Sequence, residues 1–426
     1  MPNGFDYSDI NDVLMRKGDM ITQVLRKNPS KSKRWNTESA KPQTVRHLNL
    51  ALVLDLIRKH QPISRANLAR HAGIHRSNIS MIVEDLQERG LLREEMSKER
   101  NRGRTPTLIY LDHGDVRVIA ANLRRERTTL ALVAFNGHIE STYTFETPRK
   151  PDAFLNEMAA GVQSMTTGPV VMKRAPVRIA QMVMSIPGIA DKTAEDAQAV
   201  WIPSMDEFSG IDLASILTSR LGFPCFLGNN AGLGAIAALR ETEKHGEKLE
   251  DFTFLFIGDV GIGSGVILHR SLYSGHDAIY AGEVGHSVID LNGPKCKCGR
   301  RGCWQMYVCD QATWTRYNPR VEFSISRFDE FLDEVEAGSP KALAALKKTA
   351  NYLSIGISNL LLTINPERIV IAGALTRVWP ILQKELKLAL FLSHHNAKVQ
   401  AIQLPADTLF MQGAIERAID LAIAQY

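Results

Sequence analysis

The spacing of apolar residues divides the chain into two parts. In the upstream part, apolar positions recur at helical spacing. Leu48, Leu52 and Leu56 share one face of the segment 44–59, which predicts a helix there. In the downstream part, short runs rich in β-branched residues alternate with amphipathic stretches. This alternation predicts an α/β fold for residues 113–426.

The downstream part is expected to open with three short strands separated by polar turns, the second of which contains Asn136-Gly137. A long helix near its end has Pro340 in the first turn and Ser339 as the expected cap. The segment 224–241 is expected to form a strand, a loop and a helix, and 252–269 to form two strands around a glycine turn. The other expected strands are 116–123, 128–135, 138–145, 178–186 and 368–375, and the other expected helices are 211–222, 339–366 and 410–426.

Residues 64–90 predict two short helices joined by a turn, which is the pattern of a helix-turn-helix unit. Ser64 is expected to cap the first helix, and Gly73 supplies the turn. The second helix is expected to begin near His75 or Ser77 and to end at Gly90. Its apolar positions repeat at helical spacing and predict a buried stripe, formed by Ile79, Ile82, Val83 and Leu86.

Polar residues away from that stripe suit base edges and phosphates in a DNA major groove. The following segment, 91–111, predicts a β-hairpin wing with arginines near its tip, and arginine in a narrow minor groove is a common use of such a wing. The alternative is a small helical domain that contacts proteins. The expected DNA contacts are Arg65, Arg76, Ser77, Asn78, Ser80, Arg102 and Arg104.

Charge is distributed unevenly along the 426 residues, which carry a net charge of +5. Residues 1–112 hold 20 Lys and Arg against 13 Asp and Glu, whereas the other residues hold 31 against 33. A basic front on a near-neutral body suggests a polyanion partner for the front alone. The length predicts several domains: a helical extension and linker at 1–43, a winged helix-turn-helix domain at 44–112, and a body at 113–426. Without a signal peptide or a membrane-spanning apolar run, the expected location is the cytoplasm.

Three of the five cysteines and one histidine lie within 18 positions. His286, Cys296, Cys298 and Cys303 offer four nitrogen and sulfur ligands, as a tetrahedral Zn²⁺ requires. Gly299 and Gly302 would let the loop turn back on itself. A full protein ligand set leaves no place for a substrate water, so the expected zinc is structural. The alternative is ordinary reduced cysteines, as expected for Cys225 and Cys309, which lie outside this spacing.

This loop resembles the signature of the ROK family (repressors, open reading frames and sugar kinases): E-x-G-H, nine residues, then C-x-C-G-x-x-G-C. The resemblance covers the chain from about residue 44 to its end and includes 186–191, 258–265 and 372–375. It implies a two-lobed actin/hexokinase-like (ribonuclease H-like) body, with one lobe at about 113–245 plus the C-terminal helix and the other at 246–405. The winged helix ahead of the body is similar to that of the family's repressors. The signature residues are Glu283, Gly285, His286, Cys296, Cys298, Gly299, Gly302 and Cys303.

Two elements of the family's kinases are missing. The catalytic base of those kinases is the Asp of an N-D-A motif, and here Asn230 stands in its place after Asn229. Their glycine-rich phosphate turn is replaced by Asn-Leu-Arg-Arg-Glu at 122–126. Losing a general base alone slows a reaction by about 10²–10⁴-fold, so the chain is not expected to be an enzyme. The alternative is an active ATP-dependent sugar kinase with an appended DNA-binding domain.

The sugar-contacting positions of the family are better retained. The resemblance implies effector contacts by Asn229, Asn230, Glu283, His286 and Gln305, where Gln305 replaces the usual Glu. Glu283 and Gln305 could instead hold the loop internally. The expected function is therefore a DNA-binding transcriptional regulator, a repressor, that binds a double-stranded operator as a homodimer or homotetramer and senses a sugar or sugar derivative. The alternative is a repressor controlled by a partner protein.

Overall fold

The computed structural model describes residues 42–96, 107–112, 116–167, 177–192, 198–275, 281–389 and 398–425. Residues 1–41 of the expected helical extension and linker, and Arg102 and Arg104 of the expected wing tip, lie outside the described residues. The chain forms two compact units. The first unit combines Ser39–Leu233 with Asp407–Tyr426, and the second unit contains Gly234–Ala406.

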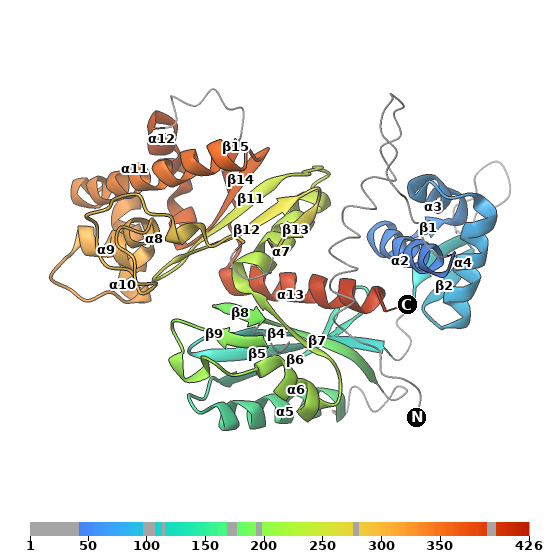
Figure 1. The fold of residues 1–426 in the computed structure, drawn as a ribbon. Coiled ribbons are helices and arrows are strands. Elements are labelled where there is room, and N and C mark those ends of the chain that lie inside the picture. The colour runs from blue at the N-terminus through green and yellow to red at the C-terminus, as the bar shows by residue number, and fades with distance from the viewer. Residues whose placement is uncertain are drawn as a thin grey trace, which may run out of the picture. The chain divides into compact units, whose positions relative to one another are not determined.

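The first unit begins with a small domain of three helices and a three-stranded sheet of order β1-β3-β2 (Figure 1). Ser64 accepts a hydrogen bond from the Asn67 amide, and Gly73 ends the helix in the left-handed region, so both expectations are confirmed. The expected buried stripe of the next helix is also confirmed. The elements are α2 (Pro42–His60), β1 (Ile63–Ser64), α3 (Arg65–Ala72), α4 (Arg76–Glu88), β2 (Leu92–Met96) and β3 (Thr107–Leu111).

The buried face of α2 differs from the one expected. The stripe through Leu52 and Leu56 is half-buried, whereas Leu50, Leu54 and Ile57 are fully buried. Both stripes are apolar, and packing against α3 and α4 decides which one enters the core.

A five-stranded sheet of order β10-β7-β4-β5-β6 forms the centre of the first unit. Figure 1 shows α5 and α6 on one face of this sheet and α13 along the other. The first core joins the sheet to α5 and α6 through apolar residues such as Leu132, Phe154 and Phe208. The elements are β4 (Val116–Leu123), β5 (Arg127–Ala134), β6 (Ile139–Glu146), α5 (Pro151–Thr167), β7 (Arg178–Ile186), β8 (Ile189–Lys192), β9 (Gln198–Trp201), η1 (Asp206–Phe208), α6 (Leu213–Leu221), β10 (Cys225–Asn229) and α13 (Ala406–Ile423).

The second unit holds another five-stranded sheet, of order β13-β12-β11-β14-β15. A large core joins one face of this sheet to α11 and α12. Ser339 precedes α11 as expected, but its side chain makes no capping hydrogen bond. The elements are α7 (Asn230–Lys244), which begins in the first unit, β11 (Phe252–Ile257), β12 (Ile262–Leu268), β13 (Ser271–Tyr273), η2 (Val284–His286), α8 (Gln305–Val308), α9 (Asp310–Tyr317), α10 (Ile325–Glu336), α11 (Pro340–Thr363), β14 (Arg368–Gly373), η3 (Ala374–Val378), α12 (Trp379–Ala389) and β15 (Lys398–Ala401).

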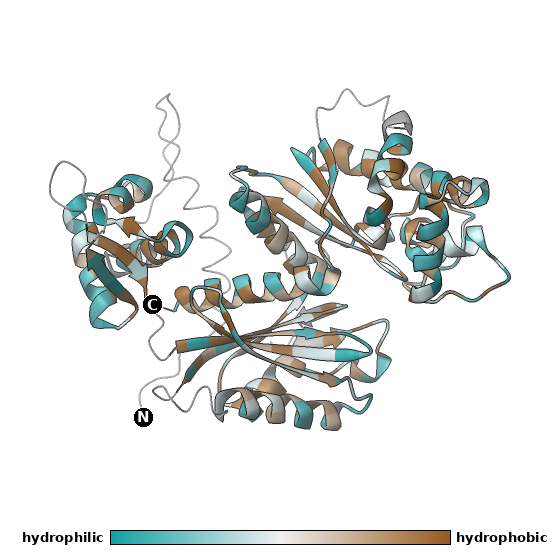
Figure 2. Ribbon diagram, turned by 180° about the vertical axis from the view of Figure 1, so that it is seen from behind, coloured by the Kyte–Doolittle hydropathy of each residue, from teal (hydrophilic) through white to brown (hydrophobic). Residues whose placement is uncertain are grey.

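The two large sheets share one plan. In each, the first three strands in chain order pair antiparallel, the fourth pairs in parallel with the first, and the fifth pairs in parallel with the fourth. Apolar residues concentrate along the inner strands, which are largely brown in Figure 2. The α/β fold expected from the sequence is confirmed. Within the described part of the chain, no helix has the length and apolar character to cross a membrane.

Candidate functional site

The loop at residues 283–305, which we call the thiol loop, gathers the three expected cysteines and the histidine. One possible ligand atom from each of His286, Cys296, Cys298 and Cys303 lies within 4.8 Å of all the others. Cys296 Sγ is 3.5 Å from His286 Nδ1, and Cys298 Sγ is 3.6 Å from Cys303 Sγ. Ligands about 2.3 Å from a tetrahedral ion lie roughly 3.8 Å from one another, so these side chains fit Zn²⁺.

Glycine is required where the thiol loop folds back. Gly299 and Gly302 have φ of +90° and +69°. A Cβ on Gly302 would lie 1.5 Å from the carbonyl oxygen of Asp290, whereas a Cβ on Gly299 would meet nothing within 4 Å. The backbone is closed by hydrogen bonds from Cys296 N to Arg300 O (2.8 Å) and from Gly302 N to Pro294 O (2.9 Å). The two glycines therefore serve different needs: Gly299 provides a turn, and Gly302 permits a close approach of two backbone segments.

The thiols of the loop differ in acidity. Burial acts to raise the pKa of Cys298, but hydrogen bonds from Arg300 and the neighbouring thiols outweigh it and lower the pKa to about 7. Burial and the adjacent thiols raise the pKa of Cys303 to about 12. Burial, with the nearby positive charge of Arg300, lowers the pKa of His286 and favours the neutral imidazole. A neutral imidazole and at least one thiolate are the forms that bind a metal.

Two expected effector residues lie against the thiol loop. Glu283 Oε2 is 3.8 Å from His286 Nε2, on the side of the ring away from Cys296, and burial raises the pKa of Glu283. A carboxylate behind a metal-binding histidine fixes the orientation of the ring. The Gln305 amide donates to Cys296 Sγ at 3.4 Å, and its Oε1 lies close to Gly261 and Gly285. Both side chains can therefore support the loop internally. This is the alternative that the sequence left open beside contact with an effector.

Asn229 and Asn230 belong to the first unit, at the junction of β10 and α7. The Asn229 amide donates to Gly188 O at 2.9 Å, and its oxygen accepts from the amides of Ala231 and Gly232 at the start of α7. The side chain of Asn229 thus links the backbone at Gly188 to the start of α7. Asn230 accepts only from the adjacent Ala231 amide, so its side-chain NH₂ makes no hydrogen bond with the described residues.

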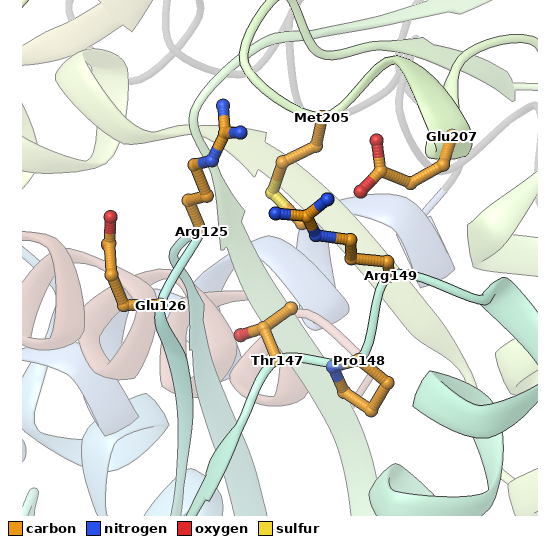
Figure 3. A pocket seen from close by; sticks show the side chains of 7 residues that line it. All are labelled: Arg125, Glu126, Thr147, Pro148, Arg149, Met205 and Glu207. Atoms are coloured by element: carbon orange, nitrogen blue, oxygen red, sulfur yellow. The ribbon is translucent and has the colours of Figure 1, made fainter.

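The turn between β4 and β5, at residues 122–126, lies beside a cavity of about 240 Å³ (Figure 3). Arg125 and Arg149 extend over this cavity, and Arg125 donates to Ser204 O at 2.9 Å. The full lining is Arg125, Glu126, Thr147, Pro148, Arg149, Met205 and Glu207. Long side chains thus occupy the turn, where a backbone built of glycines could have approached a phosphate closely.

The start of α4 presents an exposed polar surface. Arg76, Ser77 and Asn78 are exposed and Ser80 is half-buried, while the stripe on the other side is buried. His75 caps the helix and contacts Ser77 Oγ at 2.8 Å through Nδ1. The four polar residues therefore lie in the first turns of one helix with at least part of each accessible, and this is the end of a recognition helix that contacts bases in a major groove.

Arg65 has a different environment from the other expected DNA contacts. Its guanidinium bonds to Glu94 (2.8 Å), Glu84 (3.3 Å) and Gln87 (3.4 Å). These partners belong to α4 and β2, so Arg65 holds the start of α3 against the rest of the small domain. Carboxylates that already bind this guanidinium would compete with DNA phosphates for it, and direct contact by Arg65 stays a prediction.

Further residues of the thiol loop carried no signal in the sequence. Tyr307 donates to Asp290 Oδ2 at 2.9 Å, and the carbonyl of the same Asp290 lies against Gly302. Trp304 is fully buried, and its indole N–H donates to Tyr352 O at 2.8 Å. The Tyr307 contact joins the loop to α8, and the Trp304 contact anchors it to α11. Each joins residues whose spacing follows no recognisable motif. Cys225 and Cys309 are buried outside the loop, as expected.

Both the small domain and the body of the chain are similar to known protein families. The profile of the ROK family matches residues 119–414, and that of the MarR family matches 51–103. The xylose repressor of Bacillus subtilis (strain 168) is 26% identical over 351 residues, which cover 80% of this chain and 86% of the relative. The N-acetylglucosamine repressor of Escherichia coli O157:H7 is 23% identical over 351 residues, which cover 79% and 83%.

Solved structures share the fold. A ROK family transcriptional regulator, described as a homologue of the E. coli MLC protein, matches with a TM-score of 0.72 at 20% identity, covering 89% of this chain and 98% of that one. A ROK family glucokinase from Streptomyces griseus, solved with glucose and AMPPNP, matches with a TM-score of 0.57 at 20% identity, covering 71% and 99%. The body thus has the fold of a regulator and of sugar kinases alike.

Proposed function

This chain belongs to the ROK family, and from that premise we propose that it is a sequence-specific DNA-binding transcriptional repressor whose kinase-like body senses a sugar or sugar derivative. The observation that carries the proposal is the exposed polar start of α4, in a domain matched by the MarR profile, ahead of a ROK body. The proposed domains are 1–43, 44–112 and 113–426. Acting on DNA, the protein would work in the cytoplasm.

The proposed DNA contacts are Arg76, Ser77, Asn78 and Ser80 in the major groove, with Arg102 and Arg104 at the wing. Arginine and asparagine read guanine and adenine edges through paired hydrogen bonds. Two half-sites require two copies of this helix, so we propose a homodimer or homotetramer.

We propose that His286, Cys296, Cys298 and Cys303 hold a structural Zn²⁺. The metal would supply four strong bonds that fix the thiol loop, with no open position for chemistry. Glu283 would orient the His286 ring from behind, and Gln305 would donate a hydrogen bond to the Cys296 sulfur. In this arrangement the loop acts as a rigid edge that presents Glu283 to an effector.

We propose that the body performs no phosphoryl transfer. An amide at Asn230 cannot take a proton from a sugar hydroxyl, and Arg124, Arg125 and Glu126 occupy the turn that would face the phosphates. Two of the relatives are named for xylose and N-acetylglucosamine, which suggests a sugar or sugar derivative as the effector. Asn230, with its free amide group, and Glu283 are the proposed sugar contacts; Asn229, His286 and Gln305 would act mainly by holding the structure around them.

The experiment that tests the proposed function has two steps. First, genomic fragments bound by the purified protein are selected and sequenced, and the Kd for the enriched site is measured by fluorescence anisotropy. The Arg76→Ala/Asn78→Ala variant should lose about 1–3 kcal/mol of specific binding for each replaced contact. Arg89→Ala is the matched control, because Arg89 follows the same helix and pairs with Asp85 within the domain. Equal specific binding by the double variant and the wild type would remove the recognition-helix assignment.

In the second step, a panel of sugars and sugar phosphates is screened for thermal stabilisation of the protein and then for release of the selected DNA. A ligand that binds the folded state raises stability by RT ln(1 + [L]/Kd). A sugar that stabilises the protein, weakens operator binding and loses both effects in Glu283→Ala supports the sensor. If operator binding is tight but no sugar affects it, control by a partner protein replaces the sugar in the proposal.

A further inference from the structure

A buried arginine joins the DNA-binding domain to the C-terminal helix within the first unit. Arg58, near the end of α2, has a side chain only 8% exposed. It donates to Glu416 at 2.6 Å and to Asp420 at 3.1 Å on α13, and to Asp55 of its own helix at 3.1 Å. We call Arg58, Asp55, Glu416 and Asp420 the clamp.

The clamp is a directional contact. A guanidinium is a planar fork that can bind two carboxylates at once in a fixed geometry, which an apolar contact cannot enforce. Glu416 and Asp420 are four residues apart, so they present their carboxylates on one side of α13. The three neighbouring carboxylates raise the pKa of Arg58, so it remains charged at every working pH. The clamp therefore fixes one orientation of α2 against α13.

The other end of α13 is held by the turn at residues 122–126. Asp407, in the first turn of α13, accepts from Asn122 Nδ2 at 3.2 Å and pairs with Arg124 Nε at 3.4 Å. The Arg124 guanidinium also lies over the ring of Phe410, 5.7 Å from its centroid. With 18 residues, α13 is about 27 Å long. Asp407 in its first turn and Asp420 in its last turn therefore lie about 20 Å apart on one rigid element, with Glu416 between them.

The same turn borders the cavity of Figure 3. Arg124 points to α13, whereas the next two residues, Arg125 and Glu126, line the cavity. A ligand that moves Arg125 or Glu126 would therefore displace the partner of Asp407 on the adjacent residue. The turn, α13 and α2 form an unbroken series of contacts inside one compact unit.

We propose that Arg58 is a positioning residue that ties the orientation of the winged helix to α13, and that α13 transmits the state of the turn at 122–126 to the DNA-binding domain. The inference rests on the proposed function for its biological meaning, since it assumes that the winged helix binds DNA. The coupling itself, between the contact of Asp407 at the start of α13 and the clamp farther along this helix, can be measured without DNA.

Hydrogen exchange of the full-length protein tests the clamp. Arg58→Met should speed amide exchange about 10-fold in both residues 53–60 and residues 416–423, because each helix end loses its partner. Arg46→Met is the matched control: Arg46 lies on the same helix, but it pairs with Asp85 inside the small domain and is exposed. The milder Glu416→Gln/Asp420→Asn variant should reproduce the effect, and combining it with Arg58→Met should add nothing. Faster exchange confined to residues 53–60, or additive effects, would overturn the clamp.

A second pair of variants tests transmission. Asp407→Ala breaks the attachment to the turn and should speed exchange in residues 53–60, which Asp407 does not contact, by about 3-fold or more. Asp212→Ala is the control, because Asp212 caps α6, which lies in the same unit on the face of the sheet opposite to α13 (Figure 1). Unchanged exchange in residues 53–60 of Asp407→Ala would overturn transmission while leaving the clamp in place.

DNA binding then separates this inference from the proposed function. If the wild type binds no selected site, the proposed function fails, and the exchange measurements still decide the coupling. If it binds, Arg58→Met and Asp407→Ala should each change the operator Kd by about 5-fold or more, with non-additive effects in the double variant. Operator affinities equal to that of the wild type in both variants would overturn the assignment of Arg58 as a positioning residue for DNA binding.

Discussion

Gly302 is a position at which one hydrogen atom cannot be replaced by a methyl group. A Cβ there would lie 1.5 Å from Asp290 O, so the loop would have to open, whereas at Gly299 the only cost is a side chain at φ +90°. We expect Gly299→Ala to lose about 1–2 kcal/mol of unfolding free energy. Gly302→Ala should lose more than about 4 kcal/mol, or fail to fold. Thermal unfolding of the two variants in parallel measures the difference, and equal losses would contradict the close approach.

Asp310 shows how burial of one carboxyl group couples stability to pH. It is buried, its Oδ1 has no hydrogen-bond partner among the described residues, and burial with the nearby charges of Asp259 and Asp329 raises its pKa well above the ordinary value. The unfolded chain loses this proton near pH 3.9. The group's contribution is therefore fully present below about pH 3.9 and is lost as pH rises toward the raised folded pKa.

Asp310→Asn removes this titration. We expect the variant to be more stable than the wild type at pH 7, by on the order of 1–3 kcal/mol, because no carboxylate has to be buried. The advantage should be absent below about pH 3.9 and should grow as pH rises from there toward the raised folded pKa. Urea unfolding at several pH values checks the expectation, and a stability difference that stays constant with pH would contradict it.

At the scale of elements, the thiol loop is expected to depend on its metal as a whole. Cys298→Ser should remove zinc from the purified protein, because a neutral hydroxyl is a poor replacement for a thiolate ligand. Metal analysis of protein purified without chelators measures this, with one zinc per chain expected for the wild type. Cys225→Ala is the control, since this buried thiol lies outside the loop. Wild-type protein without zinc would end the proposal of a structural metal.

The sequence predicted elements better than it predicted their partners. Continuous apolar runs predicted the bounds of β4, β7 and β14 to within a residue or two. A short apolar run bounded by turn residues is typical of a buried strand. The β8–β9 hairpin and the strand β15 were missed because they are only four residues long and carry little pattern. Helix α2 was expected, but the choice between its two apolar stripes depended on packing with α3 and α4.

In the candidate site, too, local patterns could be predicted from the sequence, whereas contacts between distant residues could not. The cluster of three cysteines and one histidine could be predicted because its members share one loop and a fixed spacing. The ion pairs of Arg65 could not, because its partners come from two other elements. Arg58 carried no signal at all, since 358 residues separate it from Glu416.

At the scale of the whole molecule, the body is expected to have the kinase fold without the kinase reaction. The purified protein should release no ADP above background from ATP and Mg²⁺ with any sugar of the panel. Asn230→Asp should also fail, because restoring the base leaves Arg124, Arg125 and Glu126 in the phosphate turn. A coupled ADP assay with an active sugar kinase as positive control measures this. Sugar-dependent ADP release by the wild type would restore the enzyme reading.

The first unit is assembled from two stretches of chain, Ser39–Leu233 and Asp407–Tyr426, with the second unit encoded between them. During synthesis the winged helix emerges early and holds its own small core, so it can fold while most of the body is still to be made. Its anchor on α13 follows the whole second unit in the chain. Until α13 has been made, a nascent chain would thus carry a folded DNA-binding domain that the clamp does not yet hold in one orientation.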